Sequence, residues 1–120
     1  MKLSRIIAGA AMLFVTVQAM AQTDKPAPDW ITTTNKPCKV WNPEPQPNES
    51  VTWSGPCKDG FASGRGILLW TENGKPDAAF DGEYANGKRN GHGVLVTANG
   101  NRIVGEWVND KLLTGNGDAI

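Results

Sequence analysis

Three Gly-x-Gly elements are the first residues of this sequence whose spacing suggests chemistry. They are Gly64-Arg65-Gly66, Gly91-His92-Gly93 and Gly115-Asn116-Gly117. A phosphate-binding loop of this kind needs a helix directly after the glycines, because amides at the start of that helix hold the phosphate. Strand-like sequence follows the glycines here instead. We therefore expect these elements to shape turns, and we expect no nucleotide cofactor.

One histidine and a few carboxylates are the other candidates for catalysis. His92 could act as a general base, but no Ser or Cys lies near it in the sequence, and a solvated histidine on a turn is favoured. Asp81, Glu83 and Glu106 could supply the carboxylate pair of a glycosidase. They are explained more simply as the polar face of an open sheet, which does not readily form a concave, water-poor pocket. We expect no enzyme activity.

The elements that would position these residues come from a repeat that starts at Val51. Four glycines of the first copy recur 27 residues later, and a third, shorter copy begins at Val104. Repeats with such a period indicate a stacked array whose terminal copies are atypical. The recurring glycines are Gly55, Gly60, Gly64 and Gly66, repeated as Gly82, Gly87, Gly91 and Gly93.

Each copy has the pattern of a β-hairpin. The apolar runs 67–70 and 94–97 are short and bounded by glycines or turn residues, which is typical of strands. Asn73-Gly74 and Asn99-Gly100 predict two-residue type I′ turns, because both central residues of such a turn need positive φ. No helical periodicity follows residue 21. We therefore predict an all-β run of antiparallel strands.

Strand alternation places the aromatic residues of the copies on a shared face. Phe80, Gly82 and Tyr84 point one way and Asp81 and Glu83 the other, and a ring can lie flat over an adjacent glycine. We interpret this face as the candidate binding surface, because exposed apolar patches commonly have a partner. The alternative is that the rings pack along the sheet and under the segment that contains Trp41. The candidate residues are Trp53, Trp70, Phe80, Tyr84 and Trp107.

These residues resemble the MORN repeat, in which aromatic, Gly-Glu-aromatic, Gly-Lys and Gly-x-Gly elements follow one another. The first copy departs from it at Cys57, which stands at the second aromatic position, and the third has Asp110 in place of a glycine. The resemblance implies an elongated, single-layer antiparallel meander over residues 51–120, with about two and a half repeats. It also implies membrane association, scaffolding or dimer formation. The second copy matches best, at Phe80, Gly82-Glu83-Tyr84, Gly87-Lys88, Gly91-His92-Gly93 and Gly100.

Residues 1–21 have the pattern of a secretory signal peptide. Lys2 and Arg5 precede an apolar run, and Ala19-Met20-Ala21 is a cleavage signal. The alternative is an uncleaved anchor, although the run is short for a membrane span. The residue directly after the cleavage signal is Gln22 and not a cysteine, which argues against a lipoprotein. We predict a periplasmic or secreted protein without a transmembrane span after cleavage.

Residues 22–50 are rich in proline and are predicted to be a linker up to about Lys36, followed by a segment that covers the sheet. The run Pro43-x-Pro45-x-Pro47 favours a polyproline II conformation and could alternatively be a ligand for an aromatic groove. In an oxidising compartment, Cys38 and Cys57 indicate a disulfide. A redox or metal pair is the alternative, but there is no Cys-x-x-Cys, and His92 alone cannot complete a zinc site.

The near-neutral net charge of the chain argues against a nucleic-acid partner. Removal of Lys2 and Arg5 leaves ten basic and twelve acidic residues, a net charge of −2 without a basic run. Such a chain lacks the electrostatic pattern of a nucleic-acid-binding protein. We therefore predict a non-catalytic module that binds a protein, or a second copy of itself, through the aromatic face. A binder of envelope lipid head groups or glycans is the alternative.

Overall fold

The computed structural model describes residues 25–118, and the predicted signal peptide lies outside them. This part of the chain contains ten β-strands and no helix, so the all-β prediction is confirmed. It therefore also contains no helix long and apolar enough to cross a membrane. The strands are β1 (Asp29–Thr32), β2 (Lys39–Asn42), β3 (Glu49–Trp53), β4 (Cys57–Lys58), β5 (Phe61–Ala62), β6 (Gly64–Glu72), β7 (Lys75–Ala85), β8 (Lys88–Val96), β9 (Arg102–Val108) and β10 (Lys111–Asp118).

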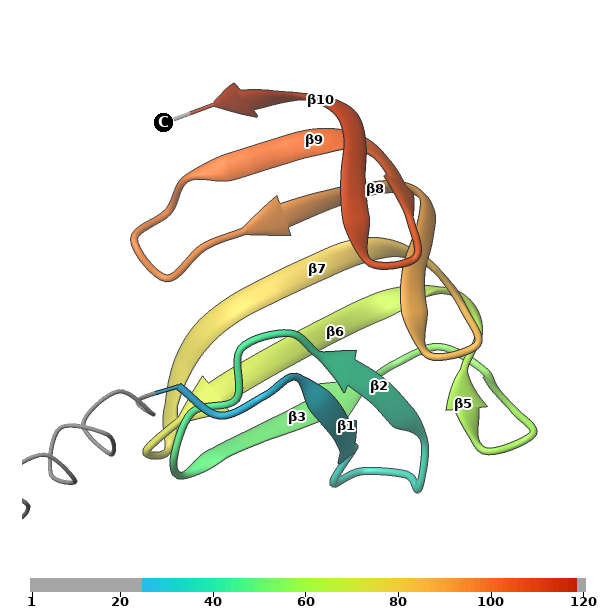
Figure 1. Ribbon diagram of the computed structural model, residues 1–120, viewed down its shortest axis with the longest axis vertical. Coiled ribbons are helices and arrows are strands. Elements are labelled where there is room, and N and C mark those ends of the chain that lie inside the picture. The colour runs from blue at the N-terminus through green and yellow to red at the C-terminus, as the bar shows by residue number, and fades with distance from the viewer. Residues whose placement is uncertain (1–24, 119–120) are drawn as a thin grey trace, which may run out of the picture.

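The larger sheet is a six-stranded antiparallel meander with the order β10-β9-β8-β7-β6-β3 (Figure 1). The sequence predicted about two and a half repeats, but β10 pairs with β9 over most of its length and completes the third hairpin. A β-bulge between Leu112 and Thr114 shifts the register of this pairing by one residue. The bulge brings Gly115, which is displaced by one residue in the sequence, opposite Gly105.

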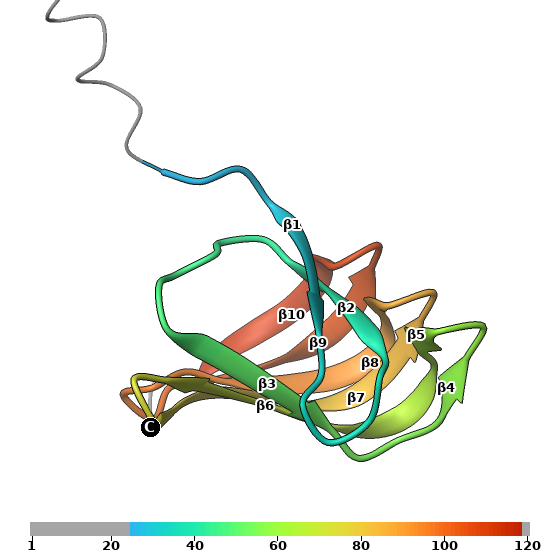
Figure 2. The same cartoon turned by 90° about the horizontal axis from the view of Figure 1, so that it is seen from below.

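A second, smaller sheet, β1-β2-β5-β4, corrects the prediction of a single layer. β1 and β2 cross the concave side of the curved meander (Figure 2). The segment before Lys36 is therefore not a free linker. Its backbone is held by the larger sheet, since the amide of Thr34 donates to the carbonyl of Val51 at 2.8 Å. The Asn35 side chain donates to the carbonyl of Trp53 (2.8 Å) and accepts from its amide (3.1 Å).

Two rows of residues run across the strands on the inner face of the meander. One row is apolar, and the next consists entirely of glycine. The rings of the apolar row lie over the glycines, so that a Cβ atom at Gly82 would lie 2.8 Å from Cε2 of Phe80. The apolar row is Trp53, Leu68, Phe80, Leu95 and Ile103, and the glycine row is Gly66, Gly82, Gly93, Gly105 and Gly115.

The turns follow the sequence in all but one hairpin. Asn73 and Gly74 both have positive φ, as the type I′ prediction requires. At Asn99-Gly100 that prediction is wrong, because φ is positive at Gly100 (94°) but not at Asn99. Hydrogen bonds from the Gly100 amide to the Thr97 carbonyl and from the Thr97 amide to the Asn101 carbonyl define a three-residue loop. The Thr97 hydroxyl stabilises the wider loop by donating to Oδ1 of Asn99.

The predicted disulfide between Cys38 and Cys57 is present, with Cα atoms 5.8 Å apart. It joins the residue before β2 to β4, and Cys38 is completely buried. The bond therefore ties the covering segment to the first repeat.

Substitution of Gly93 by alanine tests the packing of rings over glycines. The new Cβ would lie 2.7 Å from Cε1 and 2.9 Å from Cε2 of Phe80, so we expect Gly93→Ala to lower the free energy of unfolding by about 2 kcal/mol or more. Phe80→Leu in the same chain should recover part of this loss, giving a non-additive double-mutant cycle in urea denaturation. Additive losses would show that the ring and the glycine are independent.

Loss of the disulfide should destabilise the fold without abolishing strand pairing. We expect the double variant Cys38→Ser/Cys57→Ser to unfold about 3 kcal/mol more easily than the oxidised protein, because the denatured chain is no longer constrained. A reducing agent should destabilise the wild type and leave the variant unchanged. Two reactive thiols in the native protein would contradict the assignment.

Candidate binding cleft

Four of the five predicted aromatic site residues lie in the core. Trp53, Phe80, Tyr84 and Trp107 are each at most 4% exposed. Their rings form a continuous row of contacts. The ring centroids are 4.9 Å apart for Trp53 and Tyr84, 5.7 Å for Tyr84 and Phe80, and 5.4 Å for Phe80 and Trp107. Only Trp70 is half-buried with part of its ring accessible. The accessible part of the aromatic face is therefore smaller than the sequence indicated.

A cleft of about 450 Å³ separates the covering segment from the inner face of the meander. One wall is the stretch from Trp41 to Gln46, and the other is formed by β6, β7 and β8 with the first residue of β3 (Glu49) and the β9–β10 turn. Trp41 and Trp70 are half-buried and lie in these opposing walls. Phe80 and Tyr84 also line the cleft, so it reaches down to the aromatic core.

The cleft begins where the covering segment is no longer hydrogen-bonded to the hairpin tips, which are the turns at Gly60, Gly87 and Asp110. The amide of Lys39 donates to the carbonyl of Gly60, and the amide of Trp41 donates to the carbonyl of Gly87, both at 2.8 Å. Every second residue along β2 therefore bonds to the next hairpin tip. The next amide in this series belongs to Pro43, which has no N–H. The covering segment is therefore not hydrogen-bonded to the third tip in this way.

The tips of the second and third hairpins are arranged equivalently despite different residues. The amide of Gly87 donates to the carbonyl of Ala62 (3.0 Å), and the amide of Asp110 donates to the carbonyl of Arg89 (2.9 Å). Asp110 stands at the glycine position and has the φ of a left-handed residue (73°). Asp110 thus keeps the backbone conformation of the glycine that it replaces and adds a side chain that can form contacts.

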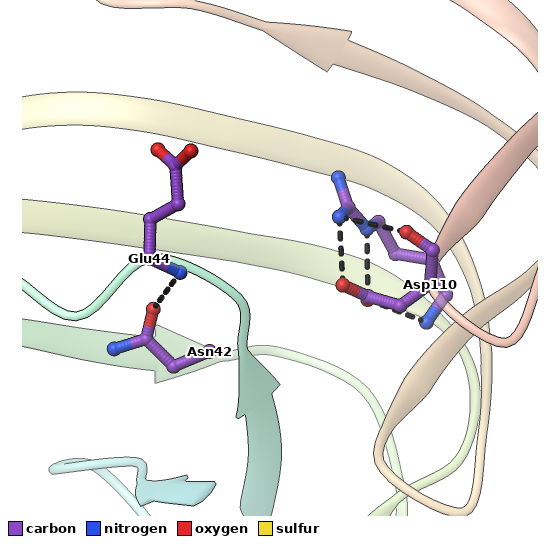
Figure 3. A network of polar contacts seen from close by, with 4 residues as sticks. Asn42, Glu44 and Asp110 are labelled. Atoms are coloured by element: carbon purple, nitrogen blue, oxygen red, sulfur yellow. Dashed lines mark hydrogen bonds and ion pairs between the residues drawn. The ribbon is translucent and has the colours of Figure 1, made fainter. Parts of the chain in front are cut away.

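The side chain of Asp110 forms an ion pair with Arg89, drawn in Figure 3. Arg89 donates from Nε and Nη2 to the two carboxylate oxygens (2.9 and 2.8 Å) and from Nη2 to the Asp110 carbonyl (3.1 Å). The guanidinium lies 4.6 Å from the ring centroid of Trp107. Both side chains are largely buried, at 13% and 5% exposure. The two charges neutralise each other, and Arg89 also donates to the Asp110 carbonyl, which receives no hydrogen bond from β2.

The covering wall is fixed by hydrogen bonds of its own. Asn42 is buried; its side chain donates to Oε1 of Glu49 (2.6 Å) and accepts from the amide of Glu44 (3.3 Å; Figure 3). The amide of Gln46 also donates to Glu49 Oε1 (2.9 Å). These bonds hold the loop through Pro43, Pro45 and Pro47 in one shape and leave the carboxylate of Glu44 without an ion-pair partner in the described residues.

Tyr84 is a buried lining residue of the cleft with a titratable hydroxyl group. It is 4% exposed, and the structure gives this hydroxyl no hydrogen bond to another of the described residues. Burial raises the pKa of Tyr84 well above its ordinary value, Arg89 opposes the shift, and Asp110 reinforces it. The hydroxyl therefore stays protonated and can donate a hydrogen bond.

The residues considered for catalysis lie outside the cleft. His92 contacts Glu106 (Nδ1 to Oε2, 2.8 Å) as an exposed cross-strand pair, and Arg65 lies 3.5 Å from Asp81 in another. These pairs have the geometry of surface contacts between neighbouring strands. Within residues 25–118, no group of three or more His, Cys, Asp or Glu side chains could hold a metal ion.

Sequence reasoning missed the acidic residues of the cleft. Their signal was absent from the sequence because they come from three separated segments that meet only in the folded protein. They are Glu44, Glu49, Glu72, Asp77 and Asp110.

Comparison with known families identifies the repeats. The MORN repeat model matches residues 58–75 and 80–102, so the chain carries MORN repeats and the family assignment from the sequence is confirmed. MORN repeats are generally associated with protein or membrane-lipid interaction. Comparisons with curated proteins and with solved structures found no match.

The Arg89–Asp110 pair should contribute strongly to stability because removal of one partner leaves a buried charge. We expect Asp110→Asn to lower the free energy of unfolding by about 3 kcal/mol. Asp81→Asn, which breaks the exposed pair with Arg65, should cost less than about 1 kcal/mol. Chemical denaturation of both variants measures the difference, and equal losses would contradict the structural role of the pair.

Proposed function

We propose that this protein is a non-catalytic extracytoplasmic module that binds a protein partner through the accessible part of its aromatic face. The observation that carries the proposal is the cleft of about 450 Å³ with Trp41 and Trp70 in opposing walls. Half-buried tryptophans that line a concave site are typical of residues that dominate binding energy. The covering segment and the meander supply a preformed wall each, which lowers the entropic cost of binding.

The sequence and the disulfide support an extracytoplasmic compartment. The disulfide between Cys38 and Cys57 is consistent with an oxidising environment, and the pattern of residues 1–21 favours export. A periplasmic or secreted location supports partners in the cell envelope. Scaffolding is the role we infer for a rigid module whose candidate catalytic residues are explained as surface pairs.

Charge favours a protein over an anionic lipid surface at this cleft. Five carboxylates line it, and its single arginine, Arg89, is already paired with Asp110. A phosphate head group would enter a region of negative potential and lose its hydration without gaining a cation. Binding of a lipid head group or a glycan is therefore the alternative that the experiment below distinguishes.

Crosslinking followed by mass spectrometry in the native envelope tests the function with a matched pair of variants. Trp70→Ala should reduce partner capture about tenfold or more, because it removes a ring of the cleft. Leu69→Ala, the adjacent residue on the opposite face of β6, should leave capture unchanged. Equal capture by both variants would contradict the proposal, and cosedimentation with liposomes or peptidoglycan that depends on Trp70 would replace it with the envelope-surface alternative.

A further inference from the structure

The cleft contains a pair of like charges that the protein itself does not neutralise. Glu49 of β3 and Glu72 of β6 are direct cross-strand partners and both line the cleft. Like charges directly opposite each other on a sheet are destabilising. Lys75 is the partner of Glu72 on the other side, but no ion pair forms between them.

Two further carboxylates add to this charge. Glu44 lies in the covering wall and Asp77 in β7, and both line the same cleft. Among the side chains of residues 25–113, the ion pairs are Arg65–Asp81, Arg89–Asp110 and His92–Glu106. These four carboxylates of the cleft thus have no ion-pair partner among the described side chains, and they do not converge on a metal site there. Glu49 accepts hydrogen bonds from Asn42 and Gln46, which offset its charge only in part.

The aromatic side chains of the cleft suit an organic cation. The protein already pairs cations with rings, since the Lys88 ammonium lies 4.8 Å from the centroid of Trp41 and Arg89 stacks on Trp107. Trp70 lines the cleft and has no such cation among the described residues. Tyr84 lies toward the other end of the cleft, because it pairs with Gly64 and Glu72 is eight residues further along β6. Its hydroxyl has no hydrogen-bond partner among the described residues, so it is available to a ligand that extends along the cleft from Trp70.

We propose that the cleft receives a lysine or arginine side chain from a basic segment of a protein partner, with the charged group between Trp70 and the carboxylates of Glu49, Glu72 and Asp77. A cation there is attracted by the ring face and by the carboxylates, and it relieves the repulsion between Glu49 and Glu72. This inference rests on the proposed function and specifies the chemistry of the partner.

Titration of the protein with capped tetralysine, tetraarginine and tetraglutamate peptides tests this directly. The two basic peptides should shift the indole N–H resonance of Trp70 and the amides of Glu72 and Asp77 in NMR spectra, and tetraglutamate should not. The double variant Glu72→Gln/Asp77→Asn should weaken binding of the basic peptides about tenfold. The control Asp81→Asn/Glu83→Gln removes the same charge from the outer face of the meander and should change the dissociation constant by less than about twofold.

The stability of Glu72→Gln gives a second, independent readout. Because it removes one of two opposed carboxylates, we expect its urea midpoint to equal or exceed that of the wild type while its affinity for tetralysine falls. A merely structural role of Glu72 would lower both.

The outcomes separate the two proposals. Equal weakening by the cleft variant and the outer-face control, or peptide shifts mapped outside the cleft, would overturn the cationic site. If capture of partners still depends on Trp70 in that case, the proposed function stands without it. If neither the basic peptides nor partners depend on the cleft, both proposals fall.

Discussion

The packing of aromatic rings over a row of glycines is the constraint on which the rest of the structure depends. A thin sheet can form a core on one face only if something fills that face without a second full layer. Phe80 does so by lying over Gly82 and Gly93, where any side chain would overlap the ring. Phe80 contacts Tyr84 and Trp107 edge-on, and the ring of Trp53 is tilted against Tyr84, which gives a continuous core from Trp53 to Trp107. The same requirement keeps four of the five rings from serving as an exposed surface.

The covering segment completes this core and also determines where it stays accessible. Trp41 donates its amide to the tip carbonyl of Gly87, and a side chain at Gly87 would overlap Trp30 and Phe61, so the tip is enclosed by the smaller sheet. At the third tip Pro43 has no backbone N–H, and Arg89 donates to the carbonyl of Asp110 instead. One proline thus ends the contact between the layers, and the cleft lies beyond it.

Much of the larger sheet was predictable from the sequence because its determinants are local. Glycine spacing, strand alternation and Asn-Gly turns act within a hairpin, and they gave the repeats and the shared face of Phe80 and Tyr84. The smaller sheet was not predictable, because β1 and β2 are positioned by distant partners such as the carbonyls of Val51 and Gly87. For the same reason the acidic cleft was missed, since Glu49 and Glu72 become neighbours only through the pairing of β3 with β6.

The two charged features of the cleft have opposite physical meanings. Arg89 and Asp110 form a buried pair whose charges cancel and whose hydrogen bonds replace those that a backbone partner would have made, so the free protein needs nothing more there. Glu49 and Glu72 lie opposite each other without a cation, and the free protein bears that repulsion continuously. A fold with marginal stability retains such a cost most readily where binding removes it. Since Trp70 lies beside this pair on the same face of β6, the uncompensated charge and the accessible ring act on the same ligand.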